Sequence, residues 1–365
     1  MKIIDAHVHF ENISLIEETK TFFQSLGIEK LNLLSPPKLR GVNSNPQAIC
    51  FKVKYPKDTY ISGGLDYSDI EGKNEKEIEA IFMEQLLRLE RIGFDGIKIL
   101  ETKPNDKIYL CARSIPFPID SRNYFSFFER LEKNQMPIFW HVADPEEFWD
   151  KKKVIPFWAK ERGWDYTSGD YPPKEEFYRR VGNVLQKFSR LKIVFAHFYF
   201  LSADLKRAAN LLDNYPNINF DITPGTEMYY NFSKNIDKSR DFFIKYADRI
   251  IFGDDADILK EGIDKDEIIT RINFMRDFLE TDKEFEVFHG QGKIKGLKLP
   301  NEVLEKIYGQ NFLRIVGEKP SQLNIHLAEE ECFRIGKMQE EKYNFSKEDN
   351  WGYQAEEFLK NHEEV

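Results

Sequence analysis

Cysteine is scarce in this chain of 365 residues, which contains only Cys50, Cys111 and Cys332. Three widely spaced thiols form neither a disulfide framework nor a Cys-x-x-Cys metal site. Such scarcity is typical of a reducing compartment. We therefore expect a cytoplasmic protein in which the thiols are buried as small apolar side chains.

An excess of positive charge is also missing. Lysine and arginine number 53 against 62 aspartates and glutamates, so the net charge is −9. Nucleic acids and anionic membranes bind basic surfaces, so this balance argues against both partners and favours a small-molecule substrate. No apolar run reaches the ~18 residues of a membrane span. The first apolar run contains Asp5 and two histidines, which is unlike the apolar core of a secretory leader.

No Gly-x-Gly-x-x-Gly motif of a dinucleotide-binding sheet follows the first apolar segment. Eight short apolar segments instead alternate with amphipathic stretches of helical period, which predicts an α/β protein with a (β/α)8 TIM barrel. The predicted strands are 3–10, 31–34, 60–65, 96–100, 137–142, 193–198, 218–222 and 249–253. The predicted helices include 13–26, 46–53, 75–92, 124–131, 174–188, 203–212, 242–247 and 266–279.

Two segments exceed what a barrel requires. Residues 144–191, after the fifth predicted strand, are long, rich in aromatics and interrupted by a Pro-Pro pair. A loop after a barrel strand lies over the C-terminal mouth, so we expect a lid or substrate wall there, with a self-packed subdomain as the alternative. We expect the barrel to span residues 1–318. Residues 319–365 are then a helical extension that packs on the barrel or on a second subunit of a homo-oligomer.

Histidines gather at the ends of the predicted strands. His7 and His9 lie two residues apart on the first strand, so both side chains leave the same face. His141 and His197 stand near the ends of the fifth and sixth strands, and the eighth leads into Gly-Asp-Asp255. TIM barrels hold their active sites at the C-terminal mouth, where imidazoles and a carboxylate would bind a catalytic divalent metal. The other histidines are interpreted as surface residues: His289, His326 and His362.

As a set, these residues resemble the amidohydrolase superfamily, and within it the amidohydrolase-2 family of metal-dependent hydrolases and decarboxylases. The resemblance rests on His-x-His on the first strand, Gly-Ile-Lys98 on the fourth, His141 and His197 on the next two, and Phe-Gly-Asp-Asp255 on the eighth. It spans roughly residues 2–317 and includes the closing stretch Leu-Pro-Asn-Glu-Val-Leu-Glu-Lys-Ile-Tyr-Gly-Gln-Asn.

The resemblance implies Zn²⁺, or Mn²⁺, Fe²⁺ or Co²⁺, held by His7, His9, His141 and Asp255. Such an ion would lower the pKa of a bound water toward ~7 and polarise a substrate carbonyl. His197 would hydrogen-bond the water or the developing oxyanion. Asp255 would take the proton from the water and pass it to the leaving group.

Lys98 leaves two arrangements open. As an ammonium, which is the form we expect, it would bind a substrate carboxylate beside one ion or repel the metal. As a carbamate formed with CO₂ it would bridge two ions, and His141 and His197 would hold the second. Four further residues are interpreted as substrate contacts or as partners that orient the ligands: Asp144, Asp221, Glu227 and Tyr229.

The predicted function is hydrolysis of an amide or of a lactone or ester bond in a small molecule by a metal-activated water. Nonoxidative decarboxylation of a small carboxylic acid with the same metal is the alternative. The decarboxylases of the family typically carry a glycine pair after the sixth-strand histidine, whereas His197 is followed by Phe-Tyr-Phe, which favours hydrolysis. A third interpretation is a barrel that binds metal without catalysis.

Overall fold

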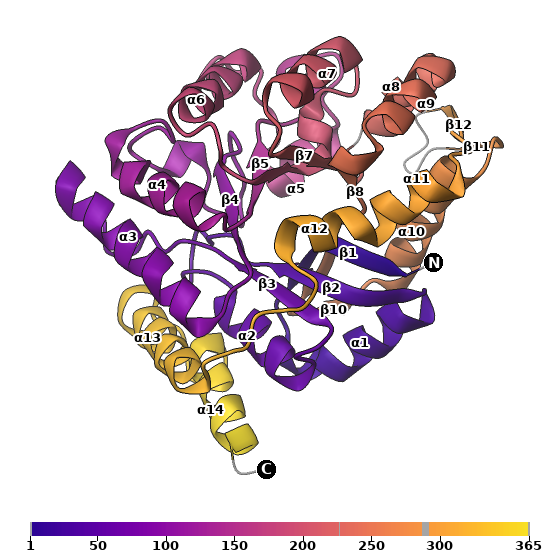
Figure 1. The fold of residues 1–365 in the computed structure, drawn as a ribbon. Helices are drawn as coiled ribbons and strands as arrows, with labels where there is room; N and C mark the ends of the chain where they lie inside the picture. The colour runs from indigo at the N-terminus through magenta and orange to yellow at the C-terminus, as the bar shows by residue number, and fades with distance from the viewer. Residues whose placement is uncertain (1, 226, 287–291, 364–365) are drawn as a thin grey trace.

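Eight parallel strands surrounded by helices form the body of the molecule (Figure 1). The computed structural model describes residues 2–225, 227–286 and 292–363. From β1 to β8, neighbouring strands pair in chain order and in parallel, so the predicted barrel and all eight of its strands are confirmed. The strands are β1 (Ile3–Phe10), β2 (Ile28–Leu34), β3 (Thr59–Gly63), β4 (Gly96–Thr102), β5 (Ile138–Val142), β6 (Ile193–Phe195), β7 (Ile218–Asp221) and β8 (Ile250–Ile251).

A bent eighth strand closes the barrel. β8 pairs with β7, and the chain then continues into β9 (Ala256–Leu259), which pairs with the end of β1. The N–H of Ala6 donates to the carbonyl of Phe252 at 3.1 Å, and the N–H of Asp255 donates to the carbonyl of His7 at 2.9 Å. The residues between β8 and β9 therefore lie against the middle of β1.

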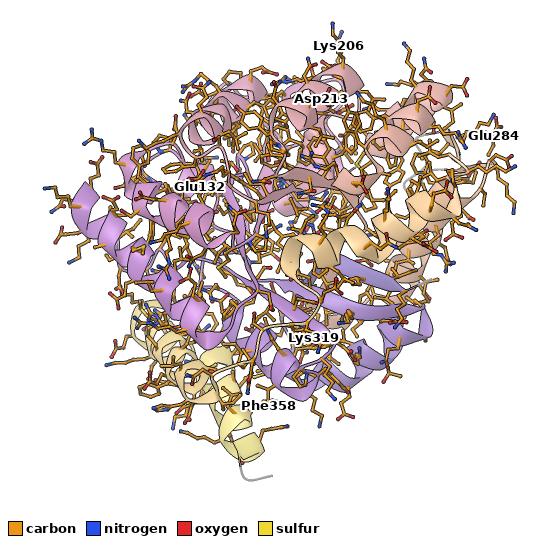
Figure 2. The ribbon with its side chains drawn as sticks, viewed as in Figure 1. Glu132, Lys206, Asp213, Glu284, Lys319 and Phe358 are labelled. Carbon is orange, nitrogen blue, oxygen red and sulfur yellow. The ribbon has the colours of Figure 1, made fainter. Side chains whose placement is uncertain are left out.

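Helices occupy the outside of the ring, and Figure 2 shows the charged side chain of Lys206 at the outer edge of this layer. The helices between barrel strands are α1 (Ile16–Ser25), α2 (Asn45–Lys54), α3 (Glu75–Ile92), α4 (Phe125–Asn134), α5 (Pro156–Arg162), α6 (Lys174–Lys187), α7 (Leu205–Asn214), α8 (Met228–Lys234) and α9 (Ile236–Lys245). After β8 come β9, β10 (Gly262–Ile263), α10 (Lys265–Glu280), β11 (Glu284–Glu286), β12 (Lys293–Lys295), α11 (Asn301–Glu305), α12 (Asn311–Val316), α13 (Ile325–Tyr343) and α14 (Trp351–Glu363).

The ends of α3 illustrate how local sequence sets a helix boundary. The side-chain oxygen of Asn74 accepts from the backbone N–H of Glu77, and the Glu77 carboxylate accepts from the N–H of Asn74. At the other end Gly93 has a φ of 104°, which glycine adopts readily, and it ends the helix. Between these caps, a stripe that includes Phe82 and Leu86 is buried in the core.

One end of the barrel is closed by α12, which lies near the centre of the ring in Figure 1. Phe312 and Ile315 of α12 are buried in a cluster with side chains of the barrel strands such as Ile4 and Val194. Apolar side chains thus fill the cylinder at this end, which makes it a packed core and not a pore.

The segment between β5 and β6 covers the opposite end. It contains the barrel helix α6, so the extra stretch is residues 144–173, shorter than the 144–191 expected. This stretch carries α5 and a short turn of 3-10 helix. Its aromatic side chains Phe148, Trp158 and Trp164 line a cavity of about 1000 Å³.

The C-terminal helices α13 and α14 form a hairpin that packs on α2 and α3 (Figure 1). Gly336 and Gly352 bring the two helices so close that a Cβ on Gly352 would lie 2.2 Å from the backbone nitrogen of Gly336. The helices expected within residues 319–365 are therefore present and lie against the barrel. In the described ranges, we find no helix with the length and apolar character needed to cross a membrane.

Candidate metal centre

His7 and His9 of β1 line a cavity of about 1000 Å³, and both side chains are buried. Nδ1 of His7 lies 2.9 Å from Oδ2 of Asp221 on β7, and Nδ1 of His9 lies 3.0 Å from the carbonyl oxygen of Leu34. An acceptor at Nδ1 places the ring proton there, so each Nε2 turns its lone pair toward the cavity. We expected Asp221 to orient a ligand or to contact substrate. Its carboxylate lies against His7, one of the predicted ligands.

The carboxylate of Asp255 meets these two imidazoles at the bend between β8 and β9. Its Oδ1 lies 3.2 Å from Nε2 of His7 and 3.3 Å from Nε2 of His9. One ligand atom from each of the three residues lies within 4.8 Å of the others. Burial alone would raise the pKa of Asp255, but the facing His7 and His9 rings hold it well below its ordinary value.

Asp254, the residue before Asp255, lies apart from this cluster. Its N–H donates to Oδ1 of Asp5 at 3.2 Å, and its own Oδ1 accepts from the N–H of Ala256 at 2.8 Å. Burial raises the pKa of Asp254 to about 6. Burial and the Asp254 charge raise the pKa of Asp5 well above its ordinary value. Of the two aspartates, Asp255 is the one whose carboxylate joins the histidines.

His197 follows β6 in a tight left-handed turn. His197, Phe198 and Tyr199 have φ values of 53°, 55° and 56°, a conformation that costs roughly 1–2 kcal/mol per residue without glycine. Oδ1 of Asp221 accepts from the backbone N–H of His197 at 2.7 Å, which holds the turn in place. Nδ1 of His197 lies 3.0 Å from Oγ1 of Thr223 and 3.2 Å from its carbonyl oxygen. Nε2 therefore faces the cavity, and burial lowers the pKa of the ring.

Lys98 of β4 stands beside the cluster. Its Nζ lies 3.1 Å from Nε2 of His7, and the residue is almost fully buried. Burial lowers the pKa of Lys98 to about 8, although the charges of Asp255 and Asp221 oppose the shift. The ammonium therefore loses its proton more readily than an exposed lysine does.

His141 of β5 lies beside His197, with 4.9 Å between the ring centroids, but its Nε2 faces away from the cluster. This atom lies 2.9 Å from the carbonyl oxygen of Ala143 and 3.2 Å from Oδ1 of Asp144. Burial and the nearby Lys103 ammonium lower the pKa of His141 to about 3. Of the four predicted metal ligands, the structure brings together His7, His9 and Asp255, and leaves His141 on a separate contact with Asp144.

The remaining predicted residues lie around the cavity or at the surface. Tyr229 lines the cavity with its ring and donates its hydroxyl to the carbonyl of Ile222 at 2.6 Å. Glu227 is buried, and burial raises its pKa to about 7. His326 has a side chain that is 79% exposed, and His362 bonds to the preceding turn of its helix. His289 lies outside the described residues.

The sequence patterns did not identify several residues of the cavity wall. Lys103 and Tyr109 come from the loop after β4, and Arg162 from the stretch after β5. Their one sequence signal is that they follow the C-terminal ends of barrel strands, where such barrels place functional groups. Lys103 pairs with Asp144, and its ammonium lies 4.3 Å from the centroid of the Trp164 ring.

The three clustered ligand atoms fit a divalent cation. Burial and the Lys98 ammonium lower the pKa of His7 to about 4, so the ring is neutral at neutral pH. Its Nε2 lone pair then faces the Asp255 carboxylate, which offers only lone pairs in return. The Lys98 ammonium is a donor beside this nitrogen, at 3.1 Å. A divalent cation held by the imidazole and the carboxylate would offset the repulsion between their lone pairs. Imidazole and carboxylate donors suit Zn²⁺, Mn²⁺, Fe²⁺ and Co²⁺.

A family model described as amidohydrolase matches residues 53–317, whereas His7 and His9 precede this range. A TIM-barrel protein from Bordetella bronchiseptica is similar with a TM-score of 0.52 and 15% identity, over 86% of this chain and 98% of that one. A manganese-bound dihydroxybenzoic acid decarboxylase from Polaromonas gives 0.52 and 14% over 86% and 96%. A 4-oxalomesaconate hydratase from Rhodopseudomonas palustris gives 0.50 and 15% over 86% and 95%. At such identities the likeness shows the fold alone, and no curated protein matches the sequence.

Proposed function

The chain belongs to the amidohydrolase family, and we propose that it is a metal-dependent hydrolase that cleaves an amide, lactone or ester bond of a small molecule with water. The convergence of His7, His9 and Asp255 at a cavity of about 1000 Å³ carries the proposal. The cavity is large enough for a small-molecule substrate. Family membership supports a metal-dependent enzyme, and the choice of hydrolysis rests on the groups around this cluster.

The proposed ligands are His7, His9 and Asp255, and His141 becomes the fourth if its Nε2 leaves Asp144. A bound divalent ion, for which Zn²⁺ is our first choice and Mn²⁺, Fe²⁺ and Co²⁺ the alternatives, supplies Lewis-acid polarisation of the substrate carbonyl and a water of lowered pKa. We propose a single ion with Lys98 as an unmodified ammonium. A carbamate of Lys98 that bridges two ions is the alternative.

His197 and Asp255 are the proposed catalytic residues. Nε2 of His197 offers a lone pair, so it accepts a hydrogen bond from the attacking water and orients it. Oδ2 of Asp255 lies 3.8 Å from this nitrogen and takes the proton of that water. Asp255 then releases this proton to the leaving amine or alkoxide.

Decarboxylation is the second candidate, and Lys98 is the observation that favours it. A buried ammonium beside the cluster would bind the carboxylate of an acid substrate. Lys103 also lines the cavity, but its ammonium is already paired with Asp144. In this reaction Lys98 would hold the substrate through the group that is lost as CO₂.

A substrate panel distinguishes the two reactions. Purified protein loaded with Zn²⁺ or Mn²⁺ is incubated with lactones, N-acyl amides and aromatic acids, while proton release and CO₂ release are recorded in parallel. We expect acid formation from a lactone or an amide without CO₂. Release of CO₂ without bond cleavage in the other classes would favour decarboxylation. Metal binding without turnover of any compound would favour the non-catalytic interpretation.

We further propose that the barrel of residues 1–318 carries the whole centre and that residues 319–365 act on it from outside. Cys50, Cys111 and Cys332 are all buried free thiols, which fits work in the reducing cytoplasm. The substrate is then a small cytoplasmic metabolite, without a nucleic-acid or membrane partner.

A further inference from the structure

The C-terminal hairpin of α13 and α14 lies outside the matched range of the amidohydrolase family, which ends at residue 317. It nevertheless contacts the loop between β2 and α2, residues 35–44, which we call the β2 loop. We propose that Trp351, at the start of α14, is a positioning residue that holds one wall of the metal cavity through this loop. The proposal rests on the proposed function only in taking this cavity as the substrate site.

Trp351 and Gln339 contact the outer side of the β2 loop. The indole Nε1–H of Trp351 donates to the carbonyl of Asn43 at 2.9 Å. A Cβ on Gly41 would lie 2.3 Å from Cη2 of this ring, and Gly41 has a φ of 90°, so the contact requires glycine. The fully buried Gln339 donates to the carbonyl of Gly41 at 2.9 Å and accepts from the N–H of Gly352 at 3.1 Å.

The inner side of the β2 loop is joined to the loop after β4, residues 103–111, which we call the β4 loop. The N–H of Leu39 donates to the carbonyl of Ile108 at 2.9 Å, and the N–H of Leu110 donates to the carbonyl of Pro37 at 3.0 Å. Two backbone hydrogen bonds in opposite directions make a short antiparallel connection. A shift of the β2 loop therefore moves the β4 loop with it.

Lys38 carries the same connection through side chains. Its ammonium lies 5.4 Å from the centroid of the Trp351 ring and forms an ion pair with Glu11, the residue after β1. The other carboxylate oxygen of Glu11 accepts from the hydroxyl of Tyr109 at 3.4 Å. Tyr109 lines the cavity, and its ring centroid lies 6.1 Å from that of His9. The contacts thus run without a gap from the C-terminal hairpin to the wall beside a proposed ligand.

The β4 loop also holds the aromatic stretch that follows β5. Oδ2 of Asp106 accepts from Nη2 of Arg162 at 3.2 Å and from Nε1 of Trp164 at 3.0 Å. All three residues line the cavity. Release of the β2 loop would therefore loosen two walls of the cavity, while His7 and Asp255 keep their own anchors on the barrel strands.

Hydrogen–deuterium exchange of the full chain tests the proposal. In W351A, we expect amide exchange in the β2 and β4 loops to rise about tenfold, because one hydrogen bond and one cation–π contact are lost. Exchange in β1, β5 and α6 should stay at its wild-type rate. W351F keeps the ring over Gly41 but loses the hydrogen bond to Asn43, so it should restore most of the protection.

Phe333→Ala is the matched control, because Phe333 is an exposed aromatic of the same hairpin whose ring centroid lies 6.0 Å from that of Tyr353. It should leave both loops protected. If W351A does not fold, K38M replaces it, because this change cuts the link to Glu11 and spares the hairpin. Unchanged exchange in the two loops, or an equal rise throughout the chain, would overturn the proposal.

Calorimetric titration with Mn²⁺ separates this proposal from the proposed function. Wild type, W351A and F333A should bind the ion with equal affinity, since Trp351 touches none of the ligands. A failure of all three to bind would count against the metal centre and leave the exchange result decisive for Trp351. For a compound that the panel shows to be turned over, W351A should raise KM and leave kcat unchanged. A lower kcat at constant KM would contradict a positioning role.

Discussion

Both ends of the barrel bury charged side chains, but the partners of these side chains differ between the two ends. At the end closed by α12, Lys52 donates to Oδ2 of Asp95 at 2.6 Å and to the carbonyl of Gly93 at 3.0 Å, while Oδ1 of Asp95 accepts from the N–H of Ser321 at 2.7 Å. At the cavity end, His7 and Asp255 turn lone pairs toward each other. A saturated network serves the fold, whereas lone pairs that converge on a cavity mark the place where a ligand can bind.

The largest effect should come from the cavity end. Asp255→Asn removes the proposed proton carrier and a metal ligand, so we expect turnover to fall by about 10³-fold or more. Circular dichroism should show an intact fold. Asp254→Asn is the matched control, because Asp254 bonds to Asp5 and not to the histidines, and it should keep its metal and most of its activity. Full turnover by Asp255→Asn would refute the assignment of the proton carrier.

At the end closed by α12, removal of a buried carboxylate should lower the stability of the fold and not the turnover. Asp95→Ala leaves the Lys52 ammonium buried without its partner, which is expected to lower the free energy of unfolding by about 3–5 kcal/mol. Urea denaturation measures the loss. Glu18→Ala breaks the exposed pair with Lys265 and should cost less than ~1 kcal/mol. Equal losses in the two variants would remove the contrast between a saturated buried network and a surface pair.

The buried acid Glu227 should make the free energy of unfolding depend on pH. Burial raises its pKa to about 7 from an unfolded value of 4.5, so the folded state holds a proton that the unfolded state releases between these values. The stabilisation of the folded state by this proton is fully present below pH 4.5. It is lost as the pH rises through 7, which lowers the free energy of unfolding by about 3 kcal/mol. Urea unfolding of wild type and E227Q between about pH 4 and 8 gives the difference directly.

In that experiment the wild type should lose stability relative to E227Q as the pH rises. Glu146 is an exposed acid in the neighbouring stretch, so E146Q serves as the control and should follow the wild-type profile. Parallel profiles for wild type and E227Q would show that the Glu227 carboxyl does not titrate differently in the folded and unfolded states.

The smallest expected effect is stabilisation by metal. A ligand that binds only the folded state at a free concentration of ~100 Kd raises the free energy of unfolding by about 2.7 kcal/mol. Thermal unfolding with added Zn²⁺ or Mn²⁺ should show this rise in wild type and lose it in His9→Ala. A similar rise in His9→Ala would locate the bound ion away from the cluster.

The barrel and the neighbourhood of His7 and His9 follow from local patterns. Strand alternation puts two residues at a spacing of two on one face whatever the rest of the chain does. The position of Asp255 was also predictable, because strand ends of a TIM barrel meet at one mouth. These inferences use only the period of a strand and the closure of a parallel sheet.

The orientation of His141 could not be predicted in this way. Its Nε2 is held by Asp144, whose carboxylate is in turn held by Lys103 and by the hydroxyl of Tyr166 at 2.5 Å. Such a chain of contacts joins segments whose relative placement no periodicity encodes. The left-handed turn at His197 is equally hard to predict, since it contains no glycine and depends on the hydrogen bond that the N–H of His197 donates to Asp221 on another strand.

The hairpin of α13 and α14 shows a further limit of sequence patterns. Helical spacing predicted helices in this part of the chain, but it does not say which loop they contact. The approach of Trp351 to Gly41 joins residues from opposite ends of the sequence, and only the folded chain brings them together.

The bend of the eighth strand has a consequence for engineering. Since β8 is registered on β7 and β9 on β1, the four-residue joint 252–255 has a length set by two neighbours at once. A single residue inserted there would displace either the Asp255 carboxylate or the pairing of β9 with β1. Attempts to graft new loops onto this scaffold should therefore leave that joint intact and vary the segments that enter the mouth from other strands.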